Sequence, residues 1–303
     1  AQTAAAAAQP APAQDNPASP PAAQNAAPTA PDAAAAPAPG AQTDAPSVET
    51  VAAPAAVVEP PAPPPPPPER TWLDIVLPGD ISMKFRLVKP GRFRFGSPVT
   101  EVGRAVTREE APRDVVIDKP FYIGRFEVTQ AQYEAVMGKN PSRFRAADKP
   151  VEQVSYSSIT SLGGFLYLLN RNLADSGHPE MTARLPTEEE WEYACRAGTT
   201  SAFSDGSDLR EASMEGNAAT FAVFGKPFGQ SSPVGSLAPN AWGLYDMHGN
   251  VEELTDKGVV RGGAWASPAR DCRCAARRNM GTSFRGDEKT GFRIVIEIKD
   301  APL

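Results

Sequence analysis

The residues of this chain best suited to covalent or metal chemistry are three cysteines and two histidines. Cys272 and Cys274 stand two residues apart in a stretch that resembles a strand, where such positions share a face. Either thiol could therefore meet Cys195, which ends a predicted helix. An odd number of cysteines in an oxidising compartment leaves one thiol unpaired. The spacing predicts one disulfide between Cys195 and either Cys272 or Cys274. In an alternative hypothesis, the thiolates of Cys272 and Cys274 together bind one Cu(I) ion.

The two histidines carry no recognisable catalytic context. Histidine is the commonest general base near neutral pH. His178 lies in a Gly-His-Pro loop typical of a protein surface, and His248 lies in a Met-His-Gly-Asn turn. Neither a Ser-His-Asp context nor a phosphate-binding loop occurs in the sequence. The pattern therefore predicts no hydrolytic or phosphoryl-transfer chemistry.

Three helices and several short strands are expected to position these residues. Thr129 is followed three residues later by Gln132, and Thr187 by Glu190, so both pairs predict a capping box at a helix start. Between them, a helix from near residue 157 has an apolar stripe of Ile159, Leu162, Leu166, Leu169 and Leu173. Strands are expected at 121–123, 259–260 and 292–296. Separate strands and helices with long loops between them indicate an α+β fold.

The first 70 residues differ sharply in composition from the rest. Residues 1–68 hold 19 of the 33 prolines and contain no Lys, Arg, Trp, Phe or Tyr. Such a segment buries too little apolar surface to offset the entropy lost on ordering. We expect a disordered or polyproline-like tether over 1–70 and one domain over 71–303. Pro-x-x-Pro with flanking basic residues, the sign of a Pro-rich ligand, is missing from the tail.

Charge and the start of the chain bear on location and partners. The five carboxylates of residues 1–68 account for most of the net charge of −6, so the domain is nearly neutral. Neither part has the basic charge typical of a nucleic-acid binder. The chain begins Ala-Gln-Thr without Met, as remains after cleavage of a signal peptide. A helix that spans a membrane needs about 20 consecutive apolar residues, and the sequence contains no such run. We expect a periplasmic protein that binds no nucleic acid.

Four motifs follow one another in order within residues 80–298. They are Pro-Val-Glu-Gln-Val-Ser at 150–155, Leu-Pro-Thr-Glu-Glu-Glu-Trp at 185–191, Asn-Ala-Trp-Gly-Leu-Tyr-Asp-Met-His-Gly-Asn at 240–250 and Gly-Gly-Ala-Trp at 262–265. Together they resemble the formylglycine-generating enzyme family, the sulfatase-modifying factors. The resemblance implies a loop-rich C-type-lectin-like fold and a packing role for His248. It also implies that Cys274 pairs with Cys195, which leaves Cys272 free.

Two departures concern the family's own chemistry. The family oxidises its substrate with two cysteines that lie between its Gly-Gly-Ser-Trp and Ala-Ala-Arg elements, whereas residues 262–271 contain no Cys. Glu252 and Leu254 stand where the family has two tryptophans. Without a thiol pair at this place we expect neither the family's activity nor a bound copper ion. Glu252 is the one residue that could serve another chemistry in the same cleft.

The resemblance also implies a calcium site. Its ligands would be the carboxylates of Asp246 and Glu253 and the backbone carbonyls of Gly249 and Val251. Calcium takes six to eight oxygen ligands, and a Gly-Asn turn can direct carbonyls inward while flanking carboxylates complete the shell. In the structural alternative, Asp246 and Glu253 only cap the turn. We expect Ca²⁺ as the cofactor.

Basic residues concentrate in the segment 261–293. Eight cationic side chains face three carboxylates there, for a net charge of +5. The resemblance assigns structural roles to Arg261, Arg277 and Arg293. The remaining arginines form a candidate recognition surface for a partner of acidic or phosphate character: Arg270, Arg273, Arg278 and Arg285.

These observations favour a non-catalytic exported binding or regulatory module on a flexible tether. A cysteine-less periplasmic relative of the family activates a membrane threonine kinase that controls type VI secretion. The partner would then be a periplasmic kinase sensor domain or an envelope lipoprotein. The alternative is a periplasmic oxidase like the one in pyoverdine maturation, which also lacks the cysteine pair.

Overall fold

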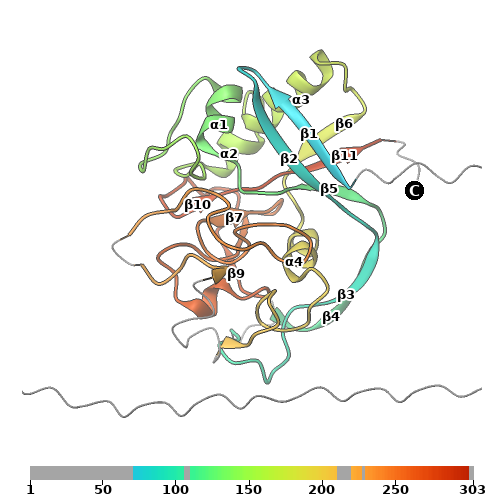
Figure 1. Ribbon diagram of the computed structural model, residues 1–303, viewed down its shortest axis with the longest axis vertical. Coiled ribbons are helices and arrows are strands. Elements are labelled where there is room, and N and C mark those ends of the chain that lie inside the picture. The colour runs from blue at the N-terminus through green and yellow to red at the C-terminus, as the bar shows by residue number, and fades with distance from the viewer. Residues whose placement is uncertain (1–70, 106–109, 210–219, 227–228, 300–303) are drawn as a thin grey trace, which may run out of the picture. The chain divides into compact units, whose positions relative to one another are not determined.

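The computed structural model describes residues 71–105, 110–209, 220–226 and 229–299 (Figure 1). The tether expected over 1–70 lies outside these residues, so the description concerns the domain alone. In these residues, no helix combines the length and the apolar character needed to cross a bilayer.

A five-stranded antiparallel sheet forms one half of the domain. Its order is β1-β2-β5-β11-β6, with bounds Trp72–Leu77, Ile81–Val88, Phe121–Gly124, Val295–Ile298 and Met181–Arg184. The hairpin between β1 and β2 turns at Gly79 and Asp80, both with positive φ. β11, near the end of the chain, pairs with both β5 and β6. Early and late segments of the sequence therefore share one sheet, as the red β11 beside the green β5 in Figure 1 shows.

Two smaller sheets carry the other half. One has the order β10-β7-β8-β9, with bounds Thr290–Gly291, Glu252–Leu254, Val259–Arg261 and Arg277–Asn279. The other pairs β3, Gly91–Phe95, with β4, Arg113–Ile117. All pairings are antiparallel except that of β10 with β7. The strands are short, and loops make up most of this half (Figure 1).

Four α-helices occur in the described residues. Their bounds are Gln130–Met137 for α1, Tyr156–Thr160 for α2, Phe165–Asp175 for α3 and Glu188–Arg196 for α4. The capping boxes expected at Thr129 and Thr187 are both present. The single helix expected from near residue 157 is two helices. Gly163 adopts φ +77° between them, and Leu162 of the expected apolar stripe is 86% exposed.

The main apolar core lies between the large sheet and helices α1 and α3. Tyr133 of α1 stacks on Phe165 of α3 with ring centroids 5.3 Å apart, and Phe292 meets both rings edge-on. A second core surrounds α4, where Trp191 is fully buried. Helix α4 packs against β3, β4 and β8 of the smaller sheets, and its buried residues share this core with β2, β5 and β11 of the large sheet, so it joins the two halves of the domain.

Two expected strands differ from the structure. The strand expected at 292–296 begins only at Val295. The stretch around Cys272 and Cys274 is a 3₁₀ helix, η3 (Ala269–Cys272), followed by a turn. Pro268 accepts a hydrogen bond from the Asp271 amide at 2.9 Å, and this closes the helical turn. Cys272 and Cys274 therefore do not share one face of a strand, and they enter different apolar clusters.

Candidate functional site

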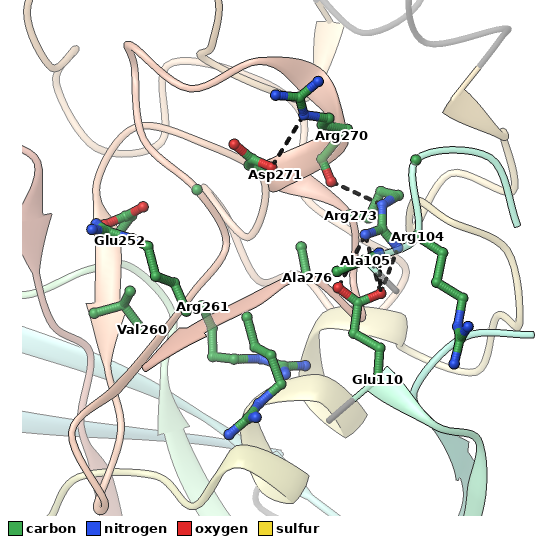
Figure 2. A pocket seen from close by; sticks show the side chains of 14 residues that line it. Arg104, Ala105, Glu110, Glu252, Val260, Arg261, Arg270, Asp271, Arg273 and Ala276 are labelled. Atoms are coloured by element: carbon green, nitrogen blue, oxygen red, sulfur yellow. Dashed lines mark hydrogen bonds and ion pairs between the residues drawn. The ribbon is translucent and has the colours of Figure 1, made fainter. Parts of the chain in front are cut away.

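A basic pocket opens beside β7, β8 and β9, with a volume of about 490 Å³ (Figure 2). Its charged lining comprises the arginines Arg104, Arg261, Arg270, Arg273, Arg277 and Arg278 and the carboxylates Glu110, Glu252 and Asp271. The other described lining residues are Gly, Ala and Val. In the described lining there is no Cys, Ser, Thr, Tyr, Lys or His. Covalent nucleophiles other than carboxylates are thus missing from this part of the pocket.

Glu252 lies on one side of the pocket and forms an ion pair with Arg278. Glu252 is only 8% exposed, whereas the Arg278 side chain is half exposed. Burial raises the pKa of Glu252, and Arg278 opposes the shift. The structure therefore places the candidate carboxylate in the pocket, with its charge already balanced by an arginine.

Arg273 is not part of a recognition surface, contrary to the expectation from sequence. It is 1% exposed and its guanidinium donates to Glu101 at 2.5 Å and to Glu110 at 3.2 Å. The turn after η3 directs this side chain inward, where two carboxylates neutralise it. Figure 2 shows the hydrogen bonds between Arg273 and Glu110. Arg270 and Arg285 are exposed, as expected, although Arg285 is not among the pocket residues.

Helix α4 supplies carboxylates to the arginines at the base of the pocket. Arg261 donates to Glu192 at 2.5 Å and to the Cys274 carbonyl at 2.8 Å. Arg277 forms a two-pronged contact with Glu188 at 2.6 and 2.8 Å. Bidentate pairs of this kind have defined geometry as well as charge. These arginines therefore have the structural roles expected of them.

A buried acidic cluster lies behind β7, at the residues expected to bind calcium. Glu253 accepts two hydrogen bonds from Arg293, at 2.7 and 2.8 Å, and one from the Trp191 indole at 2.6 Å. Asp246 accepts from the Gly235 amide at 2.7 Å. The sequence analysis did not identify the third acid of this cluster, Glu127. Its position between Phe126 and Val128, just before the capping box at Thr129, could have indicated a buried carboxylate with a specific role.

Glu127 holds the Gly-Asn turn in place. Its carboxylate accepts from the Asn250 side chain at 2.6 Å and from the Val251 amide at 3.0 Å. Gly249 is required at this turn because its φ is +94° and an added Cβ would lie 2.1 Å from the Val223 carbonyl oxygen. The turn and the cluster are therefore one unit of structure.

The cluster carries more negative charge than its arginine balances. Burial raises the pKa of Glu127 well above its usual range, and the neighbouring Asp246 and Glu253 add to the shift. Burial also raises the pKa of Asp246 to about 6. Three carboxylates face Arg293, so protons or a cation would complete the charge balance. This set of oxygen donors fits a hard cation such as Ca²⁺. Both carboxylate oxygens of Glu253 already accept hydrogen bonds from Arg293 or Trp191. Calcium binding therefore stays a prediction.

The three thiols are buried, and two of them are neighbours. The sulfur atoms of Cys195 and Cys274 lie 3.4 Å apart as free thiols, a distance well beyond the ~2.05 Å of a disulfide bond. Cys272 contacts the Pro268 carbonyl at 3.8 Å instead. The structure thus brings Cys195 together with Cys274, the partner that the resemblance implies, while the bond itself stays a prediction. Burial raises the pKa of Cys195 well above its usual value, and nearby Arg196 only partly opposes this rise.

His248 lies next to these thiols. Its Nε2 is 3.8 Å from the Cys195 sulfur and 2.8 Å from the Ser204 hydroxyl, and its Nδ1 is 2.8 Å from the Cys272 carbonyl. Burial lowers the pKa of His248 to about 4, so the ring is neutral at physiological pH. The ring packs edge-on against Phe203. His178, by contrast, is half exposed.

Residues 82–298 match the profile of the sulfatase-modifying factor enzyme 1-like domain. The chain belongs to this family. The relationship that the ordered motifs indicated is confirmed, and with it the α+β, loop-rich C-type-lectin-like fold of sulfatase-modifying factor domains.

Curated proteins resemble the chain to different extents. The chaperone protein LppX of Paenibacillus barcinonensis is 32% identical, over 58% of this chain and 79% of LppX. The serine/threonine-protein kinase pkn1 of Chlamydia pneumoniae is 27% identical, over 66% of this chain but only 36% of the kinase. The similarity therefore concerns about a third of the kinase's length.

Two solved structures share the fold. Treponema denticola variable protein 1 superposes with a TM-score of 0.61 at 21% identity, over 75% of this chain and 99% of that protein. At this identity it supports the fold alone. PvdO from Pseudomonas aeruginosa superposes with a TM-score of 0.59 at 27% identity, over 71% of this chain and 94% of PvdO.

Proposed function

We propose that this chain is a non-catalytic binding or regulatory domain that recognises an acidic or phosphorylated segment of a protein partner through the basic pocket. The observation that carries the proposal is the described lining of that pocket, in which Arg270 and Arg278 keep exposed side chains and no thiol, hydroxyl or imidazole occurs. Guanidinium groups suit carboxylate and phosphate recognition because they present paired N–H donors.

We propose further that the domain is exported to the periplasm and acts on the sensor domain of a membrane threonine kinase of type VI secretion, or on an envelope lipoprotein. The similarity to the kinase pkn1 supports a link between this domain type and kinases. The similarity to LppX, named a chaperone protein, supports a role in contact with other proteins. Bound Ca²⁺ at Asp246, Gly249, Val251 and Glu253 would serve this function by stabilising the turn behind the pocket.

The likeness to PvdO favours one second candidate, a periplasmic maturation oxidase. Its reacting group would be Glu252, which lies in the pocket with a raised pKa. A general acid or base is more useful when its pKa is closer to the working pH. The ion pair with Arg278 argues against this role, because it stabilises the charged carboxylate.

Two measurements distinguish these functions. Purified chain supplied with copper should convert no Cys-x-Pro-x-Arg peptide to the aldehyde, since the family's thiol pair is missing at 262–271. The Glu252→Ala variant should still bind the purified sensor domain, with a changed Kd. Aldehyde product would refute the non-catalytic proposal. A turnover of the pyoverdine-maturation type that Glu252→Ala abolishes would favour the oxidase.

A further inference from the structure

Cys195, Cys274 and His248 form a cluster without a binding or catalytic role above, whose two thiols would form the predicted disulfide when oxidised. Their ligating atoms, two sulfurs and Nε2, all lie within 4.8 Å of one another, and all three residues are buried. The residues come from α4, from the turn after η3 and from the Met-His-Gly-Asn turn, so only the folded chain assembles them. We propose that the reduced cluster is a site for one Cu(I) ion.

The donor set and its spacing suit Cu(I). Thiolate and imidazole are ligands that select soft cations such as Cu(I) and Zn²⁺. Two metal–sulfur bonds of about 2.3 Å can span up to roughly 4.6 Å, and the sulfurs of Cys195 and Cys274 are 3.4 Å apart. Structural zinc sites normally have four protein ligands. In the described residues the cluster has three such ligands, which favours the lower coordination number of Cu(I).

The surroundings orient the imidazole as a ligand. The Cys272 carbonyl lies 2.8 Å from Nδ1 and accepts a hydrogen bond from its N–H, which leaves the Nε2 lone pair directed toward Ser204 and Cys195. Metal-bound histidines almost always have an outer partner of this kind on the second nitrogen. The Ser204 amide and hydroxyl both donate to Nε2 in this tautomer, so both hydrogen bonds must be released when a metal binds.

Two cationic groups, Arg196 and Arg261, lie next to the cluster and share the single carboxylate of Glu192. Arg261 donates to the Cys274 carbonyl at 2.8 Å, and Arg196 follows Cys195 directly on α4. Two thiolates and one Cu(I) leave a net charge of −1, which these arginines face. The site is separate from the loop at 262–271, where the family's own cysteine pair would be, and its burial excludes a substrate from the ion.

The test uses full-length chain purified anaerobically with a reductant, and a thiol titration first counts the free thiols, of which three are expected. Cu(I) is added in competition with bathocuproine disulfonate. We expect one tightly bound Cu(I) per chain and an X-ray absorption spectrum with two sulfur ligands and one nitrogen ligand. Cys195→Ser and Cys274→Ser should each weaken binding by more than about 100-fold, beyond the range typical of outer-shell changes.

Cys272→Ser is the matched control, because Cys272 is equally buried and lies two residues from Cys274. It should retain the wild-type affinity, and melting curves of all variants check the fold. Three results would each overturn the proposal: no tight Cu(I) in the reduced chain, equal losses in Cys272→Ser and Cys274→Ser, or a Cys195–Cys274 disulfide that reductant does not open. The spectrum of the unmutated chain decides the ligands even where a variant fails to fold.

Discussion

Glu252 and Glu253 are neighbours on β7 but serve two different regions. Successive side chains of a strand point to opposite faces. Glu252 lines the basic pocket and pairs with Arg278, whose side chain is half exposed. Glu253 points into the buried cluster, where Arg293 and Trp191 bind both of its oxygens. Two adjacent glutamates therefore form two kinds of ion pair: that of Glu252 lies at the edge of a pocket, and that of Glu253 is buried within the domain.

The difference shows which charges can change partners. Removing water from an ion pair makes the loss of either member costly, because the remaining charge is left buried and uncompensated. A half-exposed arginine can instead turn to water or to an incoming anion. The interior pair thus maintains the structure, and the pair at the pocket is the one that a ligand could displace.

The largest effect is expected from breaking the interior pair. Glu253→Ala should lower the free energy of unfolding by about 3–5 kcal/mol, because the buried Arg293 guanidinium and the buried Trp191 indole both lose their hydrogen-bond acceptor. The matched variant Glu252→Ala should lower it by less than about 1 kcal/mol, since the freed Arg278 can reach solvent. Urea denaturation of both variants measures the difference. Equal losses would show that the two faces of β7 are energetically alike.

A smaller effect is expected from calcium, and it should depend on pH. The folded-state pKa of Asp246 is raised to about 6, so its ionisation lowers stability as pH rises from about 4 through 6 in the absence of a cation. Ca²⁺ binds the ionised form and should raise Tm more at pH 7 than at pH 5. At 100 times its Kd, calcium would add about 2.7 kcal/mol.

Differential scanning calorimetry with calcium and with chelator, at both pH values, measures this effect. Asp246→Asn is the control, and it should remove most of the response to calcium. An identical shift in Tm at both pH values, or an unchanged response in Asp246→Asn, would place any calcium elsewhere.

The smallest effect on stability is expected on the exposed side of the pocket. Arg270→Glu should change the free energy of unfolding by less than about 0.5 kcal/mol, because its contact with Asp271 is long, at 3.7 Å, and exposed. The same variant should weaken binding of the sensor domain, most strongly at low salt. Arg285→Glu makes the same charge change outside the pocket. Equal weakening by both variants would mean that net charge, and not the pocket, determines binding.

Local sequence signals predicted the helix starts well and the cysteine region poorly. The capping boxes at Thr129 and Thr187 depend on residues three apart, so nearby chemistry is enough to specify them. Leu162 fits an apolar stripe, but the glycines after it break the helix and expose it. The spacing of Cys272 and Cys274 suggested a strand because the turn that begins at Pro268 was not recognised.

By itself, the sequence determined the family, the helix caps, the neutrality of the domain and the loss of the thiol pair at 262–271. Each of these depends on residue identity or on short spacing. Only the tertiary structure decided that Arg273 is buried, that Glu127 joins the acidic cluster and that His248 lies beside Cys195. These contacts join segments from 53 to 172 residues apart, and their energy depends on burial and on distances that local patterns do not encode.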